Sequence, residues 1–126
     1  MKRIYLATPV NARKEKTMRH KMKAAHQRKI EMENYLRKVF PDALFYSSFD
    51  IPEVFNFIIN EYDKLLISEP EIMGKCTEMV MQSDMIILDD GWENSKGCTV
   101  ERFVAMQYGK QVRTFNSFLL KDKLNK

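Results

Sequence analysis

The residues with the clearest chemical potential lie between positions 88 and 109, "LDDGWENSKGCTVERFVAMQYG". A hydrophobic run ends there in a polar loop, and apolar residues at helical spacing resume around one acid, Glu101. In the first turn of a helix, an acid gains about 0.3–1 kcal/mol from the helix dipole. The same carboxylate, kept ionised by that dipole and aimed into a cleft, suits nucleophilic attack in glycosyl transfer, because the reacting sugar carbon becomes cation-like. The spacing of residues around Glu101 by itself favours the first interpretation, in which the acid only stabilises the start of the helix.

The loop before Glu101 has features of an anion site. Gly91 and Gly97 allow backbone amides to turn toward an anion, and the start of a helix behind them adds its positive end. Ser95 would add a hydroxyl donor. The loop is neither a P-loop nor a dinucleotide fingerprint. An equally good alternative is that Gly97 allows a tight turn while Ser95 or Thr99 caps the helix.

Of four further residues near this loop, three have both a functional and a structural interpretation. Asp89 would orient a sugar hydroxyl or simply be solvated, and Trp92 would stack on a base or anchor the loop. Asp84 is typical of a turn or capping residue. Cys98, beside a helix start, has the position of a reactive thiol, although a small helix-packing residue is the better interpretation.

Hydrophobic periodicity predicts strands alternating with helices along the chain. The predicted strands are 3–7, "ALFYSS", "MIILDD" and "QVRTF". The predicted helices are 17–40, 51–65, 70–82 and 99–108, and "SFLLKDKLNK" is a C-terminal helix or tail. Such alternation predicts a three-layer α/β sandwich, Rossmann-like or flavodoxin-like, with a parallel sheet of four or five strands. Loops 8–16 and 91–98 should meet at the carboxyl ends of the strands, where ligands bind in these folds.

Composition narrows the class of protein. A chain of 126 residues, 44% of them hydrophobic, predicts one globular domain spanning 1–126. No apolar run has the length of a membrane span, and the N-terminus does not resemble a signal peptide. The two cysteines lack zinc or redox spacing and the two histidines lack partner ligands. We therefore expect no metal and a reducing, cytoplasmic location.

The net charge of +4 is concentrated in one segment, Arg13–Lys29, where basic residues are opposed only by Glu15. Such a segment would meet nucleic acid, an anionic ligand or an acidic neighbour, or form a solvated helix face, which is the favoured interpretation. Nucleic acid ranks last as a partner, because aromatic residues are not interleaved with these charges.

Two stretches, "IYLATP" near the N-terminus and "SDMIILDDGWENSKGCTVERFVAMQYGK", resemble the nucleoside 2-deoxyribosyltransferase superfamily. The likeness is closest to a small branch with a W-x-x-S-x-G-x-x-x-E loop. It is strong over residues 84–110, fair over 3–9 and only topological between them.

The resemblance implies cleavage of N-glycosidic bonds in (deoxy)nucleosides or their 5′-monophosphates, by transfer or hydrolysis, with Glu101 as nucleophile and no cofactor. Ser95 matches a serine that binds the 5′-phosphate in the hydrolase group, which favours a nucleotide substrate. Tyr5 matches a tyrosine of the active site. Thr8, Pro9 and Asn11 fall where the family places loop residues that contact phosphate or sugar.

One position departs from the family. Where the resemblance implies an Asp that protonates or holds the leaving base, this chain has Cys76. Loss of such a group would cost about 10²–10⁴-fold in rate. The alternative is therefore a weak or inactive enzyme that binds a nucleotide as a sensor or sequestering protein. The resemblance also implies a homo-oligomer, dimer or higher, whose neighbouring subunits complete each site.

Overall fold

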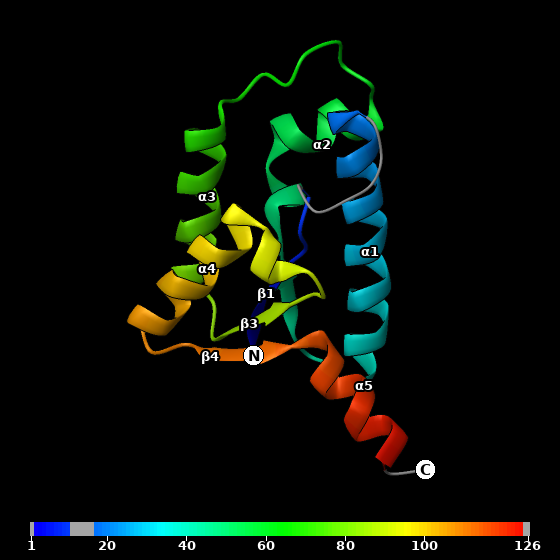
Figure 1. Cartoon of the computed structure of the whole chain (residues 1–126), viewed down its shortest axis with the longest axis vertical. Helices are drawn as coiled ribbons and strands as arrows, with labels where there is room; N and C mark the ends of the chain where they lie inside the picture. The colour runs from blue at the N-terminus through cyan, green and yellow to red at the C-terminus, as the bar shows by residue number, and fades with distance from the viewer. Residues whose placement is uncertain (1, 11–16, 125–126) are drawn as a thin grey trace.

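The sheet holds the fold together. In the computed structural model, which describes residues 2–10 and 17–124, four parallel strands lie in the order β2-β1-β3-β4 (Figure 1). They are β1 (Arg3–Ala7), β2 (Leu44–Tyr46), β3 (Met85–Leu88) and β4 (Gln111–Thr114). Tyr5 pairs with Ile86 at the centre of the sheet. The predicted α/β class with a parallel sheet is confirmed, at four strands.

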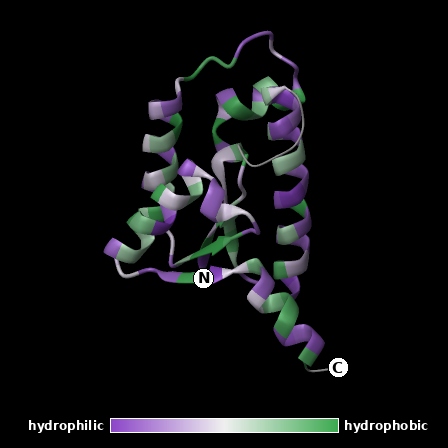
Figure 2. Ribbon diagram, in the orientation of Figure 1, coloured by the Kyte–Doolittle hydropathy of each residue, from purple (hydrophilic) through white to green (hydrophobic). Residues whose placement is uncertain are grey.

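Both faces of the two central strands are covered. β1 and β3 alternate between two cores, as the two-residue period of a strand requires. One core contains Tyr5, Ala7, Ile86 and Leu88, and the other contains Ile4, Leu6, Met85 and Ile87. Because neither face meets water, β3 is hydrophobic throughout (Figure 2).

Five helices form the outer layers. They are α1 (Met18–Val39), α2 (Pro52–Ile59), α3 (Glu69–Gln82), α4 (Lys96–Gln107) and α5 (Phe115–Leu124), with short 3₁₀ turns at Ser48–Asp50 and Trp92–Asn94. Side chains of α2, α3 and α4 fill the core with Tyr5, whereas α5 and the second half of α1 fill the core with Ile4. Among the described helices, none is long and apolar enough to cross a membrane.

The helix predicted over 51–65 is shorter than its periodicity indicates. It ends at Ile59, and Glu61 adopts a left-handed conformation with φ of 52°. The guanidinium of Arg19 on α1 donates to the carbonyl oxygens of Phe57, at 3.0 Å, and Tyr62. This tertiary contact holds the chain after Ile59 in a non-helical path that hydrophobic spacing does not reveal.

The described part of the basic segment pairs with the chain itself. Lys23 bonds Glu61 at 3.0 Å, and Arg28 donates two hydrogen bonds, both 3.0 Å, to Asp89. Arg13, like the other basic residues of 11–16, lies outside the described residues. Lys23 and Glu61 remain exposed, as a solvated face requires, whereas Arg28 makes a part-buried contact with the end of β3.

The described residues of the two loops predicted to form the site, 8–10 and 91–98, lie at the same edge of the sheet, and several of them line one cavity. The backbone N–H of Asp89, just after β3, donates to the carbonyl of Ala7 at 3.0 Å. Asp84, at the opposite end of β3, accepts from the backbone N–H of Arg3 at 2.8 Å, which agrees with its predicted turn role. The carboxyl ends of β1 and β3 thus lie side by side at one edge of the sheet, where ligands bind in folds of this class.

Candidate functional site

Tyr5 and Glu101 form the centre of the site. Tyr5 lies on β1 and is 1% exposed, and Glu101 lies on α4 and is 5% exposed. The Tyr5 hydroxyl donates a short hydrogen bond to Oε2 of Glu101. One oxygen of the Glu101 carboxylate is thus held by Tyr5, and Glu101 also lines the cavity described below.

Cys76 on α3 completes the cluster. It is 1% exposed, and its thiol has hydrogen-bonding contacts with both Tyr5 and Glu101. Three elements that are distant in sequence, β1, α3 and α4, therefore each contribute one polar side chain to an otherwise apolar core.

Burial controls the protonation of this cluster. It raises the pKa of Glu101 to about 7, against the opposing effect of hydrogen bonds from Tyr5 and Cys76. Burial and the nearby Glu101 carboxylate raise the pKa of Cys76 to about 12 and the pKa of Tyr5 well above its ordinary value. Near neutral pH, Tyr5 and Cys76 are hydrogen-bond donors, and Glu101 is the member of the trio that changes charge.

The position of Glu101 corrects one expectation. Helix α4 begins at Lys96, three residues before the predicted start, so Glu101 lies in its second turn and no acid occupies the first. The helix dipole acts mainly within the first turn. Glu101 is therefore not held ionised by the helix N-terminus, and desolvation dominates its pKa instead.

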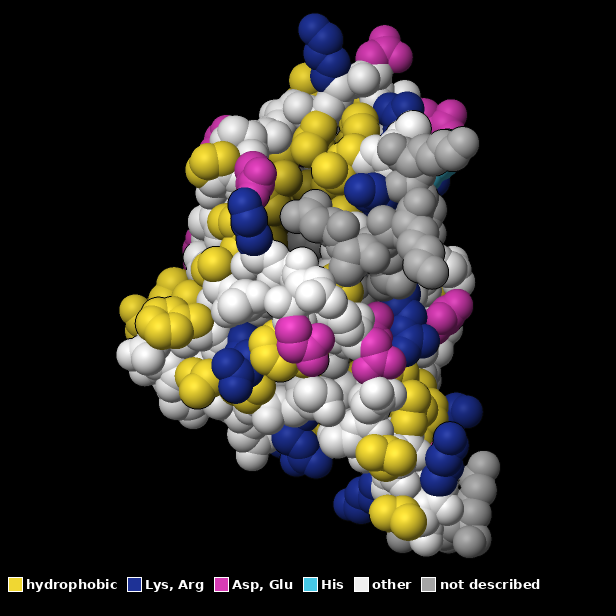
Figure 3. All heavy atoms as spheres, viewed as in Figure 1, with side chains coloured by type: hydrophobic (Ala, Val, Ile, Leu, Met, Phe, Trp, Pro, Cys, Tyr) yellow, Lys and Arg dark blue, Asp and Glu magenta, His cyan; other side chains and the backbone are white. Residues whose placement is uncertain are grey.

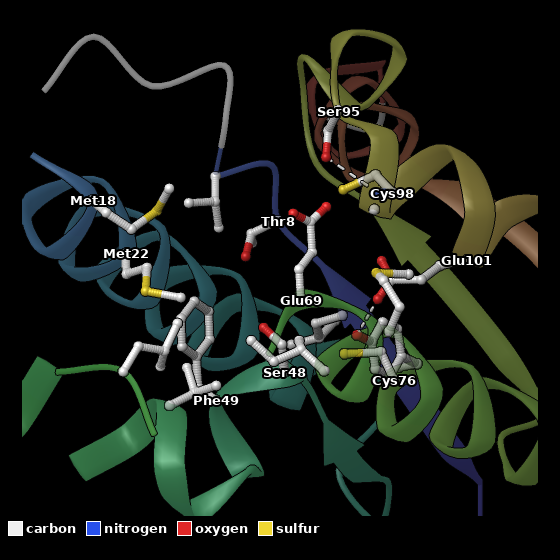
Figure 4. Close-up of a pocket in the computed structure, with 18 residues that line it drawn as sticks. Thr8, Met18, Met22, Ser48, Phe49, Glu69, Cys76, Ser95, Cys98 and Glu101 are labelled. Carbon is white, nitrogen blue, oxygen red and sulfur yellow. Dashed lines mark hydrogen bonds between the residues drawn. The ribbon is translucent and has the colours of Figure 1, made fainter. Parts of the chain in front are cut away.

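A cavity of about 210 Å³ opens beside the cluster. Glu101 and Cys76 lie on one side of it and Met18, Met22 and Phe49 on the other (Figure 4). The polar lining residues are Tyr5, Thr8, Ser48, Glu69, Ser95 and Glu101. On the surface, hydrophobic side chains gather in a hollow between α2 and α3 (Figure 3). One side of the cavity thus suits a flat apolar group and the other a polar one.

The N-terminus of α4 forms part of the cavity wall. Ser95 is 5% exposed and caps the helix, since its Oγ accepts from the N–H of Cys98 at 3.2 Å. Gly97 packs close to α3, because a Cβ on it would lie 3.6 Å from Sδ of Met73. Cys98 is buried in the core, as its predicted packing role requires. The capping alternative for Ser95 is confirmed, and the residue also faces the cavity.

Some predicted site residues are not among those that line the cavity. Asp89 is buried and held by Arg28, Pro9 is buried, and Trp92 packs against the core under the guanidinium of Arg102, 5.0 Å from the ring centre. Gly91, with φ of 84°, supplies the left-handed turn before the 3₁₀ turn at Trp92–Asn94. Asn11 lies outside the described residues.

Comparison with known proteins decides the family. A family model described as "Domain of unknown function (DUF4406)" matches residues 2–114. The chain belongs to the DUF4406 family. No curated protein and no solved structure matched it. The DUF4406 match includes the whole sheet and the Tyr5, Cys76 and Glu101 cluster, and it ends before α5.

Sequence reasoning missed one charged residue of this DUF4406 site. Glu69, the first residue of α3, is exposed and lines the cavity. Its position carries a signal, because Glu69 precedes Cys76 by seven residues, or two helical turns, which places both on one face of α3. Among the described residues, no group of His, Cys, Asp and Glu could hold a metal ion.

Proposed function

We propose that this protein cleaves the N-glycosidic bond of a (deoxy)nucleoside or its 5′-monophosphate, with Glu101 as the nucleophile. The observation that carries the proposal is a buried carboxylate, oriented by a tyrosine hydroxyl, on the wall of a cavity of small-molecule size. A carboxylate buried beside a cavity with a strongly shifted pKa is typical of a functional site.

The chemistry follows from the two oxygens of Glu101. With Oε2 held by Tyr5, Oε1 attacks the anomeric carbon of the sugar. A glycosyl ester forms as the bond to the base nitrogen breaks, and the departing nitrogen takes the electron pair and then a proton from solvent water. Water or a second base then attacks the same carbon and releases Glu101 as a carboxylate.

The shape of the cavity agrees with this substrate class. The Met18, Met22 and Phe49 side offers polarizable and aromatic contacts to a nucleobase, and the Ser95 side offers hydrogen bonds to the other end of the sugar. Because Glu101 must be ionised to attack, activity should rise as the pH passes through about 7.

Cys76 favours a second candidate function. Burial keeps its thiol protonated, with a pKa of about 12, so it is a poor proton source for a departing base. The same cavity on a catalytically weak protein would bind nucleosides or nucleotides as a sensor or a sequestering protein.

Release of free base distinguishes the two functions. The purified protein is incubated with deoxynucleosides and deoxynucleoside 5′-monophosphates, and the liberated base is measured by chromatography. We expect base release by the wild type and its loss in Glu101→Gln. Glu93→Gln serves as the control, because Glu93 carries the same charge in the same loop–helix segment but does not line the cavity.

Calorimetric titration with the same compounds separates the alternatives. Binding without base release would support the sensor function and contradict catalysis. Base release that persists in Glu101→Gln would contradict the nucleophile assignment.

A further inference from the structure

Helices α3 and α4 lie side by side and run in the same direction through the site. Met73 of α3 lies against Gly97 of α4, and one turn later Cys76 contacts Glu101. One turn along α3, from Met73 to Cys76, thus corresponds to one turn along α4, from Gly97 to Glu101. This register fixes which residues of α3 face the N-terminal end of α4.

Glu69 lies one turn before Met73 on the same face of α3. Extending the register back by one turn places it level with a point before Lys96, where α4 begins. Its carboxylate therefore lies off the N-terminal end of α4. In Figure 4 that carboxylate points toward the space between Thr8 and the turn formed by Ser95 and Cys98.

This is the place where a phosphate would otherwise bind. The first-turn amides of a helix have no partner within the helix and attract anions. Here the carboxylate of Glu69 already brings a negative charge to that end, and Glu101 brings a second to the same cavity. Among the described lining residues there is no Lys, Arg or His to balance them.

We infer that Glu69 selects a nucleoside with a free 5′-hydroxyl over a nucleoside 5′-monophosphate. This inference rests on the proposed function and names its substrate class. A carboxylate accepts a hydrogen bond from a sugar hydroxyl, whereas it repels a phosphate dianion. This is the opposite of the preference that Ser95 indicated, and the cap that its Oγ gives to the N–H of Cys98 provides a structural reason for a serine at that position.

The test compares the two substrate classes in matched variants. Base release is measured as kcat/KM for each deoxynucleoside and for its 5′-monophosphate, in the wild type, Glu69→Gln and Glu78→Gln. Glu78 is an exposed acid of α3 that does not line the cavity, so its variant controls for the change in net charge. Thermal melting checks that each variant is folded.

We expect the wild type to prefer deoxynucleosides. In Glu69→Gln the ratio of monophosphate to nucleoside kcat/KM should rise about tenfold through loss of like-charge repulsion, while Glu78→Gln leaves that ratio unchanged. A wild type that prefers monophosphates, or a ratio that Glu69→Gln does not move, would overturn the inference and leave the role of Glu101 intact.

A binding experiment keeps the two proposals distinguishable. If no compound releases base, catalysis fails, and calorimetry with Glu101→Gln and with Glu101→Gln/Glu69→Gln then decides the selectivity alone. Tighter binding of deoxynucleosides, weakened by the Glu69 substitution, would support the inference. Equal or tighter binding of monophosphates, or no binding of either class, would overturn it.

Discussion

Glu101 shows how strongly one buried residue depends on its surroundings. An exposed carboxyl titrates near pH 4.5, whereas the pKa of this group is raised to about 7 by burial and opposed by hydrogen bonds from Tyr5 and Cys76. The carboxylate therefore destabilises the fold when it is charged. A group that is kept despite such a cost is characteristic of functional sites, where stability and activity conflict.

The pH dependence of stability tests this cost. The folded state binds the Glu101 proton more tightly than the unfolded state, so the associated stability is complete below pH 4.5 and is lost as the pH rises through about 7. The loss amounts to about 3 kcal/mol. Glu101→Gln should therefore be more stable than the wild type at pH 8 and nearly equal to it at pH 4.5, by urea unfolding.

Exposed Glu78→Gln provides the comparison for that experiment, because it changes the same charge without changing a buried group. If the difference in unfolding free energy between wild type and Glu101→Gln stayed constant from pH 4.5 to pH 8, the raised pKa would be refuted.

At the scale of elements, the capped N-terminal turn of α4 determines the position of Glu101 in the helix. Ser95 closes its first turn by accepting from the N–H of Cys98, and Thr99 donates back to the carbonyl of Ser95 at 2.6 Å. This arrangement fixes where α4 begins and thus which turn carries Glu101. The hydrophobic pattern predicted the helix, but the capping hydrogen bond set its first residue.

Removal of the cap has a defined effect. Ser95→Ala should lower the free energy of unfolding by about 1 kcal/mol, because the Cys98 amide loses its acceptor in a buried position. Ser95→Thr, which keeps a capping hydroxyl, should recover most of that loss. Chemical denaturation of the three proteins measures it, and an unchanged midpoint in Ser95→Ala would contradict the capping role.

For the whole molecule, Arg28 links three parts of the fold. Its guanidinium on α1 binds the carboxylate of Asp89 at the end of β3 and lies 5.1 Å from the ring centre of Phe115 on α5. Asp89 is 2% exposed, and its buried carboxylate accepts both hydrogen bonds from this guanidinium. The contact fastens the edge of the sheet that bears the site to the helix layer behind it.

Breaking this pair should destabilise the protein far more than breaking an exposed one. Arg28→Met should lower the unfolding free energy by about 3 kcal/mol, since a buried carboxylate loses two charged hydrogen bonds. Arg37→Met, which removes an exposed partner of Glu33 on the same helix, should change it by less than about 1 kcal/mol. Similar losses in both variants, measured by denaturant titration, would show that Asp89 does not depend on Arg28.

The sequence by itself determined the order and type of most elements. Continuous apolar residues in 85–88 specify a strand covered on both faces, and periodic apolar residues over α1 and α3 specify amphipathic helices, because these patterns act through neighbours near in sequence. The sequence did not predict the non-helical path after Ile59. That path depends on Arg19, which lies 38 residues before Phe57 and donates a hydrogen bond to the backbone carbonyl of Phe57.

Only the tertiary structure decided the chemistry of the site. Tyr5 and Glu101 are 96 residues apart, and their hydrogen bond exists because β1 and α4 pack together. The packing of the helices likewise places Glu69 at the cavity and brings Arg28 within hydrogen-bonding distance of Asp89. A pKa depends on desolvation and on nearby charges, both of which are properties of the folded surroundings rather than of a residue's place in the chain.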